Sequence, residues 1–374
     1  MRLTAKQKIR VDIISQYMSG KLYYRDAINS LEISERHFRR LVKRFRKDGI
    51  SSVLHQNTGK PPPNKISNTD TTQIIRLYKT TYKGLNIAHF IEKLRDNEGM
   101  IPPSYSTVRR ILINENIIGK SFKRAKRSHP RRQRYSKEGI MVQIDGSHHR
   151  WIHGVDMMCL TAAIDDATGK ILGAKFTPTE TTFAAMDVTE QIIKNYGVFQ
   201  MLYSDRAGIY GGGKRDGYSN MNRAMRTLGI VPIQAGSPQA KGRVERLFKT
   251  LQDRLCSEMR LSGVKNIKEA NLFLKGYILK FNEQFGVKAV DPELGYRELD
   301  THINLDDVFT MITLRKVQSG EVVHLNSTKY ILQSDISLVG KEAEVREYRD
   351  GRMEIYVLGE KVEYNYYDHF KRAI

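Results

Sequence analysis

Two apolar stretches in the middle of the chain each end in an aspartate, and this repeat constrains the fold more than any other feature. Residues 140–144 lead to Asp145, and residues 198–204 lead to Asp205. Short apolar stretches bounded by polar residues are typical of buried strands. A third acidic residue, Glu245, lies one to two turns into a basic amphipathic segment that predicts a helix. Two aspartates at strand ends and a glutamate on a helix can converge on one site.

The region that holds these three residues alternates between strand and helix patterns. From residue 140 to 290 we expect three strands and then further strands joined by helices, which together predict a mixed α/β sheet. The expected strands span residues 140–145, 157–165, 170–177, 198–204 and 230–234. Asp165 and Asp166 could supply a fourth carboxylate. They open the turn sequence of residues 165–169, however, so a hairpin turn is the favoured interpretation.

Nearly all of the net positive charge of the chain lies in its N-terminal part. The net charge is +21. Residues 1–140 hold 31 lysine and arginine residues against 11 acidic residues, whereas residues 141–374 hold 31 against 30. A requirement for solubility alone would not confine the charge in this way. The asymmetry therefore predicts a nucleic-acid-binding N-terminal region joined to a nearly neutral folded region.

Three short helices are expected in residues 1–54, with Ser34 as the N-cap of the last one. That helix is apolar on one face and basic on the other, which is typical of a helix-turn-helix unit that binds DNA. A general three-helix domain with a solvated basic face is the alternative. Residues 67–119 repeat the pattern and predict a second such unit. The side chains expected to contact DNA from the two units are Arg36, Arg39, Arg40, Lys43, Arg44, Lys47, Arg109 and Arg110.

Two linkers, a core and a C-terminal module complete the predicted organisation. Residues 55–66 form a stiff Pro-rich linker, and residues 120–138 form a basic linker that is expected to follow DNA phosphates. The basic side chains expected to do so are Lys123, Arg124, Lys126, Arg127, Arg131 and Arg132. Residues 139–290 form the α/β core, on which DNA contacts are expected from Lys241, Arg243 and Lys249. Residues 291–374 predict a small β-barrel module that contacts DNA or protein, because the Asp350-Gly351 pair is a hairpin signal.

The three acidic residues suit the chemistry of phosphodiester bonds. Moving such a bond requires an activated oxygen nucleophile and stabilisation of the leaving 3′-oxygen. Two Mg²⁺ ions about 3.5–4 Å apart can supply both, and Mg²⁺ prefers oxygen ligands. We expect Asp145 to bridge the two ions, Asp205 to hold one of them and Glu245 the other. Lys241 and Lys249 flank Glu245 on the helix, for which an ordinary surface salt-bridge pattern is the alternative.

Three segments around these residues stand out as motifs. They are Gln143-Ile144-Asp145-Gly146-Ser147, Tyr203-Ser204-Asp205-Arg206 and Ser237-Pro238-Gln239-Ala240-Lys241-Gly242-Arg243-Val244-Glu245-Arg246. They resemble the catalytic signatures of DDE transposases with a retroviral-integrase-like core, and the likeness to ISNCY-type insertion-sequence transposases covers nearly the whole chain. The resemblance implies a ribonuclease H-like fold and two Mg²⁺ ions, for which Mn²⁺ can substitute. It also implies that Asp145, Asp205 and Glu245 are the catalytic metal ligands.

The sequence departs from this family pattern between the second and third motifs. Ala207 stands where many relatives have glycine, and the 39 residues between Asp205 and Glu245 exceed the usual retroviral spacing. Both differences lie near the glycine-rich, basic residues 211–215, which are a candidate mobile loop beside the site. They bear on the shape of that loop more than on the metal site.

Histidine and cysteine residues in the core predict no zinc centre. His148 and His149 follow Asp145 closely but lack the cysteine partners or helical spacing of a zinc site, so we expect them to position the nucleophile or to contact DNA. Cys159 and Cys256 are expected to be buried free thiols in a reducing compartment. The sequence holds no run of 18 apolar residues. We therefore expect a soluble protein of the bacterial cytoplasm that is associated with the nucleoid and has no membrane partner.

Together these patterns predict a DNA transposase. Its helix-turn-helix units would bind the terminal inverted repeats of double-stranded DNA, and its core would cleave 3′ ends and transfer them to target DNA. Pairing two ends requires a homodimer or a higher oligomer. A metal-dependent DNA endonuclease without strand transfer is one alternative, and a sequence-specific DNA-binding regulator with a catalytically silent core is another. An RNA-directed ribonuclease is disfavoured, because helix-turn-helix units read the B-form major groove.

Overall fold

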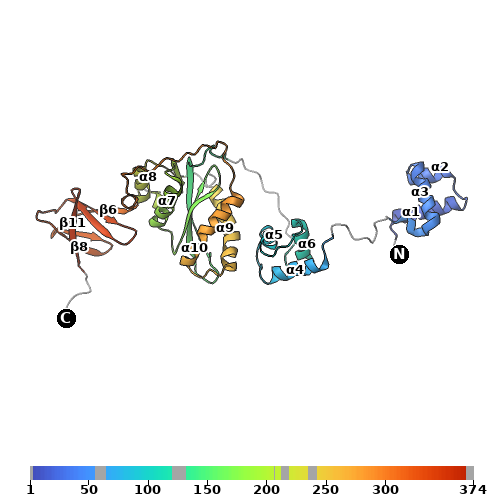
Figure 1. The fold of residues 1–374 in the computed structure, drawn as a ribbon, viewed down its shortest axis with the longest axis horizontal. Helices are drawn as coiled ribbons and strands as arrows, with labels where there is room; N and C mark the ends of the chain where they lie inside the picture. The colour runs from blue at the N-terminus through green and yellow to red at the C-terminus, as the bar shows by residue number, and fades with distance from the viewer. Residues whose placement is uncertain are drawn as a thin grey trace. The chain divides into compact units, whose positions relative to one another are not determined.

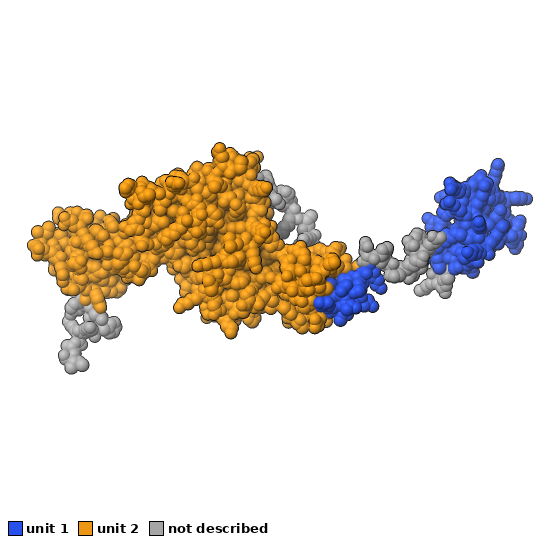
Figure 2. Space-filling model, in the orientation of Figure 1, with its two compact units in different colours: residues 1–74 blue, residues 75–374 orange. Residues whose placement is uncertain are grey.

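The computed structural model describes residues 3–54, 65–119, 132–205, 207–211, 219–234 and 242–367. The chain divides into two compact units, residues 1–74 and residues 75–374, which are coloured separately in Figure 2. The division falls within one helix, α4 (Asn68–Lys79). The finer boundaries expected from the sequence stay predictions.

The first unit is built on three helices and a short 3₁₀ helix. They are α1 (Ala5–Met18), α2 (Tyr24–Leu31), α3 (Glu35–Asp48) and η1 (Gly49–Val53). Ser34 caps α3 as expected, since its hydroxyl accepts a hydrogen bond from the backbone N–H of His37 at 3.3 Å. Phe38 of α3 is buried in one cluster with Ile14 of α1 and Ala27 of α2. The apolar face of α3 is thus used for packing, which leaves its basic face exposed.

The second unit begins with the three helices expected in this part of the sequence. After α4 come α5 (Ile87–Asp96) and α6 (Tyr105–Asn114). The side chains of Asn86 and Ser104 cap these two helices. Phe90 of α5 is fully buried, and its ring packs edge-on against Tyr78 of α4 at a centroid distance of 5.0 Å. Aromatic packing and two capped N-termini therefore define this small helical region.

Charged side chains join α5 to α9 (Gly242–Leu261). Arg254 of α9 donates two hydrogen bonds to Glu92, at 2.6 and 3.0 Å. Glu258 of α9 contacts the buried ring of His89 at 2.6 Å and the Lys93 ammonium at 2.8 Å. Burial alone would raise the pKa of Glu258, but the hydrogen bonds from His89 and Lys93 outweigh it and lower the pKa to about 2. These contacts hold α5 on the helix that carries Glu245.

A five-stranded sheet forms the centre of the second unit. Its strands are β1 (Met141–His149), β2 (Met158–Asp165), β3 (Ile171–Thr177), β4 (Met201–Ser204) and β5 (Val231–Gln234). Their order is β3-β2-β1-β4-β5. The first three strands pair antiparallel, whereas β4 and β5 continue from β1 in parallel. This confirms the expected mixed sheet of the ribonuclease H-like type, a meander extended by helix-linked strands.

Helices cover both faces of this sheet (Figure 1). One face carries α7 (Thr182–Tyr196), the short η2 (Gly208–Tyr210) and α8 (Asn220–Thr227). The other face carries α9 and α10 (Ile267–Phe285). Ile144 of β1 lies in the core cluster on the α7 face, and Ala162 of β2 lies in the cluster on the α9 face. Because both faces are covered, β2 is buried along its full length.

The C-terminal part is a six-stranded antiparallel sheet, which confirms the predicted small β module. It follows α11 (Leu305–Val308) and comprises β6 (Met311–Lys316), β7 (Val322–Leu325), β8 (Thr328–Gln333), β9 (Glu342–Glu347), β10 (Met353–Val357) and β11 (Glu360–Tyr367). The strand order is β6-β9-β10-β11-β8-β7. Asn326 and Ser327 join β7 to β8 with φ angles of 47° and 67°. Positive φ angles at both central residues are typical of a two-residue hairpin turn.

Two arginines attach this module to the core. Arg349, in the turn between β9 and β10, binds Asp187 of α7 at 3.1 Å and also binds Glu190. Arg223 of α8 donates to the backbone oxygen of Val308 at 2.9 Å. The module is therefore fixed to the α7 face of the sheet.

The two cysteines are free thiols. Cys159 is buried and Cys256 is half-buried, and burial raises the pKa of each thiol to about 11. Within the described ranges, no helix combines the length and the apolar character that crossing a membrane requires.

Candidate functional site

The pairing of β1 with β4 ends just before Asp145 and Asp205. The two strands run parallel, and their pairing ends with Gln143 opposite Tyr203. Continuing this register by two residues would set Asp145 opposite Asp205, at the spacing of about 4.8 Å between neighbouring strands. Asp205 directly follows β4, whereas Asp145 lies in the middle of β1, which continues to His149.

The residue that pairs with Asp145 on β2 shows toward which face of the sheet the Asp145 side chain projects. Asp145 pairs with Ala162, and cross-strand partners project from the same face of a sheet. Since Ala162 packs in the cluster with α9 and α10, Asp145 projects toward the α9 face. Backbone groups orient both half-buried carboxylates. Asp145 accepts a hydrogen bond from the backbone N–H of Gly146 at 3.0 Å, and Asp205 accepts one from that of Ala207 at 2.8 Å.

Glu245 is exposed in the first turn of α9, above the buried side of that helix. The Gln252 amide donates a hydrogen bond to the Ser147 hydroxyl at 3.2 Å. Residues seven apart share a helix face, so Glu245 and Gln252 lie on one face of α9. Residues two apart share a strand face, so Ser147 and Asp145 lie on one face of β1. The helix face of Glu245 is therefore turned toward the strand face of Asp145.

The donor chemistry of these residues fits a hard divalent cation. Carboxylate oxygens from two adjacent strand ends and from a facing helix are ligands that Mg²⁺ and Mn²⁺ prefer. In the parts of the chain that the structure describes, no three histidine, cysteine, aspartate or glutamate side chains are close enough to hold a metal ion together. The joint binding of a cation by Asp145, Asp205 and Glu245 therefore stays a prediction.

The two histidines that follow Asp145 take different positions. His148 is exposed, whereas His149 is half-buried and packs its ring edge-on against Trp151 at a centroid distance of 5.4 Å. Trp151 itself is fully buried, with its indole N–H donating to the backbone oxygen of Ser147 at 3.0 Å. Positioning of substrate by His148 or His149 stays a prediction.

Asp165 and Asp166 have structural roles, and Asp166 binds two of the arginines predicted to contact DNA. Buried Asp165 accepts hydrogen bonds at the β2–β3 turn, as a hairpin role requires, and burial raises its pKa. Asp166 is fully buried and binds the guanidinium groups of both Arg132 and Arg243. Burial lowers the pKa of Arg243. These two arginines neutralise a buried carboxylate, and their contacts with DNA stay predictions.

The exposed face of α3 carries most of the basic side chains predicted to contact DNA. Arg36, Arg40, Lys43 and Lys47 are all exposed. Arg39 is also exposed, and its guanidinium binds the Tyr24 hydroxyl at 2.9 Å and Glu35 at 3.2 Å. Arg44 differs from these side chains, because it is half-buried and donates to the backbone oxygen of Ser52 at 3.0 Å. Its position on the flank that packs against η1 explains the difference.

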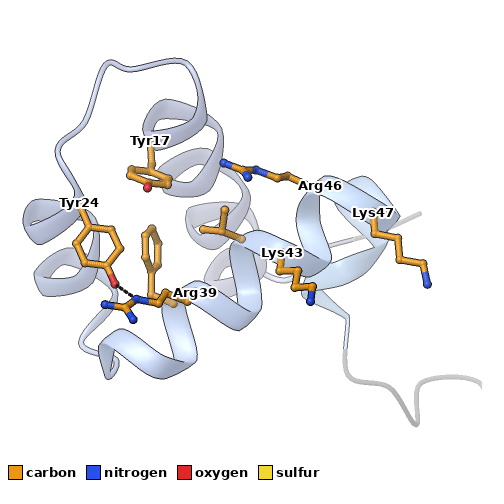
Figure 3. Close-up of a pocket in the computed structure, with 8 residues that line it drawn as sticks. Tyr17, Tyr24, Arg39, Lys43, Arg46 and Lys47 are labelled. Carbon is orange, nitrogen blue, oxygen red and sulfur yellow. Dashed lines mark hydrogen bonds between the residues drawn. The ribbon is translucent and has the colours of Figure 1, made fainter.

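A groove of about 620 Å³ opens beside this face, between α3 and the first two helices (Figure 3). Its inner wall is aromatic, with Tyr17 and Phe38 packed edge-on at a centroid distance of 5.1 Å. Its rim is basic. The lining residues are Tyr17, Tyr24, Phe38, Arg39, Val42, Lys43, Arg46 and Lys47. A cationic rim over an aromatic wall can accept a phosphodiester together with its sugar or base.

Sequence reasoning missed Arg46 as a member of this basic rim. Arg46 is seven positions after Arg39, so helical spacing would have placed the two on the same flank. Tyr210 is 1% exposed and belongs to the core cluster on the α7 face.

Several predicted residues lie outside the described part of the chain. They are Lys123, Arg124, Lys126, Arg127, Arg131 and Lys241, together with the predicted helix start at 237–238 and most of the glycine-rich segment 211–215. Among the described residues, Arg110 and Lys249 are exposed, and Arg109 is half-buried. The DNA contacts of these residues stay predictions.

Known proteins are similar to nearly the full length of this chain. The y4bF protein of Sinorhizobium fredii, provisionally named a transposase, is 30% identical over 97% of this chain and 81% of its own length. The transposase for insertion sequence IS1202 of Streptococcus pneumoniae is 32% identical over 85% of this chain and 76% of its own length. The winged helix-turn-helix family matches residues 10–71.

Solved structures show a more distant likeness. A chain in the structure of the simian T-cell lymphotropic virus intasome in complex with PP2A regulatory subunit B56 gamma is 14% identical over 78% of this chain and 98% of its own, with a TM-score of 0.36. The catalytic core domain of HTLV-2 integrase in complex with magnesium is 15% identical over 41% of this chain and 90% of its own, with a TM-score of 0.32.

Proposed function

This chain belongs to the transposases of insertion sequences, and we propose that it cleaves DNA at the terminal inverted repeats of its element and joins the freed 3′ ends to target DNA. The observation that carries this proposal is the parallel pairing of β1 and β4 up to Gln143 and Tyr203, two residues before Asp145 and Asp205. The contact between Gln252 and Ser147 supports a position of Glu245 on the face of α9 that is turned toward β1. Three acidic side chains in a chain that also has a DNA-binding region suit phosphodiester chemistry.

In the proposed reaction, the carboxylates of Asp145, Asp205 and Glu245 would hold the divalent cations. When bound, Mg²⁺ or Mn²⁺ activates the attacking oxygen and neutralises charge on the leaving 3′-oxygen. The backbone N–H groups of Gly146 and Ala207 keep the two aspartate carboxylates oriented. The same three carboxylates can serve both steps, first with water and then with a DNA 3′-hydroxyl as the attacking group.

The first unit supplies the proposed recognition of the element's ends. Exposed Arg36, Arg40, Lys43 and Lys47 on α3 form a basic face suited to the major groove and its phosphates. Two ends must be paired for transposition, so the active complex holds at least two copies of the chain. This oligomeric state is inferred from the need to pair two DNA ends.

The proposal is tested with purified protein and supercoiled plasmid in the presence of Mg²⁺ or Mn²⁺. We expect the wild type to nick the plasmid only when metal is present. Asp205→Asn and Glu245→Gln should each abolish nicking, and excess metal should not restore it in either variant. Glu298→Gln serves as the matched control, because Glu298 is exposed and lies outside the site. DNA affinity, measured by fluorescence anisotropy, should be nearly the same for Asp205→Asn as for the wild type.

The products separate the alternatives. Joined molecules in which a 3′ end is linked to target DNA support the transposase, whereas cleavage without joining would favour an endonuclease. If the wild type binds DNA but neither cleaves plasmid nor joins cognate ends with either metal, the silent regulator becomes the better interpretation. Equal loss of binding and cleavage in Asp205→Asn would contradict the separation of the two functions.

A further inference from the structure

A buried carboxylate joins the strand of Asp145 to the helix of Glu245. Asp166 directly follows β2, and its side chain is fully buried. Its Oδ1 atom accepts a hydrogen bond from the Gln143 amide of β1 at 2.7 Å and also binds the Arg243 guanidinium of α9. Gln143 lies two residues before Asp145 on β1. Arg243 lies two residues before Glu245 on α9. One carboxylate oxygen therefore connects the two elements next to both acidic residues.

A second contact joins β1 and α9 beyond these acidic residues. The Gln252 amide of α9 donates a hydrogen bond to the Ser147 hydroxyl of β1 at 3.2 Å. From residue 243 to residue 252 the helix rises about 13 Å. From residue 143 to residue 147 the strand also rises about 13 Å. Because the two lengths match, both contacts form without bending either element, and Asp145 and Glu245 lie between them in the chain.

The Asp166 carboxylate binds a second arginine, from the segment that precedes β1. Arg132 forms an ion pair with the same oxygen, and the backbone N–H of Tyr135 donates to the other oxygen at 3.0 Å. One guanidinium is enough to neutralise one carboxylate, and two guanidinium groups beside each other repel. Arg243 is therefore not needed to neutralise Asp166. What it adds is a tie between this buried point and α9.

The other contacts of the first turns of α9 are less directional. Val244 and Leu247 pack in the apolar cluster between α9 and the sheet. Apolar burial holds a helix against a sheet but is not directional, whereas a charged hydrogen bond fixes both distance and orientation. Arg243 donates a further hydrogen bond to the backbone oxygen of Arg132 at 2.9 Å. The guanidinium of Arg243 is thus held at two points.

We propose that Asp166 and Arg243 are positioning residues for Glu245. The pair holds the first turn of α9 in a fixed place beside β1, so that Glu245 keeps a constant position relative to Asp145. Neither residue touches the substrate in this role, because both act through Glu245. The inference deepens the proposed function and rests on the participation of Glu245 in it.

The first test is amide hydrogen exchange of the full-length chain without DNA or metal. It follows residues 246–251, the first amides of α9 whose partners lie within the helix. Arg243→Ala should speed their exchange about tenfold or more. Arg132→Ala is the matched control, because it removes a guanidinium from the same carboxylate without touching α9, and exchange at 246–251 should stay at the wild-type rate. Thermal unfolding checks that both variants are folded, and Arg243→Lys, which keeps the charge, should exchange at an intermediate rate.

The second test is the rate of plasmid nicking as a function of DNA concentration. Arg243→Ala should lower the rate at saturating DNA about tenfold or more, because a displaced Glu245 slows the reaction. The KM for DNA should change less than about threefold. Arg243→Lys should recover part of the rate, and Glu298→Gln is the control for the loss of an exposed charge. A direct contact between Arg243 and DNA predicts a different pattern, with a raised KM and unchanged exchange at 246–251.

The outcomes separate this inference from the proposed function. Equal exchange at 246–251 in the wild type and Arg243→Ala overturns the inference, and so does faster exchange with an unchanged nicking rate. Equal acceleration by Arg132→Ala also overturns it, because neutralisation of Asp166 would then explain the effect. If the wild type neither nicks nor joins DNA, the proposed function fails, while the exchange rates still decide whether Asp166 and Arg243 fix the first turn of α9.

Discussion

The two helical regions of the N-terminal part have the same sequence pattern but use their charges differently. On α3 of the first unit, Arg36, Arg40 and Lys47 are exposed on the face opposite the buried side chains. On α5 of the second unit, Glu92 and Lys93 instead form ion pairs with α9. A basic amphipathic sequence pattern therefore does not by itself predict whether the charged side chains bind nucleic acid or pair with another helix.

The difference has a consequence for what each region does. Exposed cations on α3 can exchange their counterions for DNA phosphates, which is the source of salt-dependent binding. The charges on α5 are partly desolvated and fix the position of α9, the helix that carries Glu245. We therefore expect α3 to govern DNA affinity and α5 to govern the stability of the core.

Removing charge from α3 should have the largest effect. Replacing Arg36, Arg40 and Lys47 together by alanine should weaken DNA binding several hundred-fold at about 0.1 M salt and reduce the salt-dependence slope by about three. Fluorescence anisotropy over a salt series measures both quantities. The control variant removes the same number of positive charges from α10. It replaces the exposed lysines Lys268, Lys275 and Lys280 by alanine. A similar loss in that control would show that the effect is only one of net charge.

Breaking the contact between α5 and α9 should lower stability and leave recognition by α3 intact. Glu258→Gln removes the charge that holds His89 and Lys93, and we expect the free energy of unfolding to fall by about 3 kcal/mol. Urea denaturation followed by circular dichroism measures the change, with exposed Glu283→Gln on α10 as the control. An unchanged stability, or a loss of DNA affinity as large as that of the α3 variant, would contradict the division of roles.

Acid should remove the same stabilisation. The pKa of Glu258 is lowered in the fold from 4.5 to about 2, so its ion pairs stabilise the fold fully above pH 4.5 and lose that contribution as the pH falls toward 2. The stability difference between wild type and Glu258→Gln should therefore shrink by about 2 kcal/mol between pH 5 and pH 3. Denaturation of both proteins at several pH values measures it, and a difference that grows with acidity would refute the assignment.

The smallest effect is expected at the groove of the first unit. Tyr24→Phe removes the hydroxyl that accepts a hydrogen bond from Arg39. Because this contact is exposed, we expect a stability change below about 1 kcal/mol and a loss of DNA affinity of no more than about fivefold. Tyr23→Phe is the matched control, since Tyr23 is 84% exposed. An affinity loss as large as that of the triple α3 variant would mean that the groove, and not the exposed face, dominates binding.

The sequence by itself determined the elements and their order. Apolar stretches that end in Asp145 and Asp205 predict two strands, and both strands are present, although β1 continues past Asp145 to His149. The capping serine of α3 and the Asp350-Gly351 turn were also predictable. These features are local, since a strand, cap or hairpin turn depends on residues within a few positions of one another. The resemblance of three motifs to a transposase family added the expected site residues.

Tertiary structure alone decided which polar side chains meet. Arg243 binds Asp166, which lies 77 positions earlier, and Arg254 binds Glu92, which lies 162 positions earlier. The space over Gly146 holds the Glu180 carboxylate. No local pattern encodes such pairs, because strand register and helix packing bring them together only when the chain has folded. For this reason the sequence singled out Asp145 and Asp205, whereas only the fold showed which of the many charged side chains are already paired within the protein.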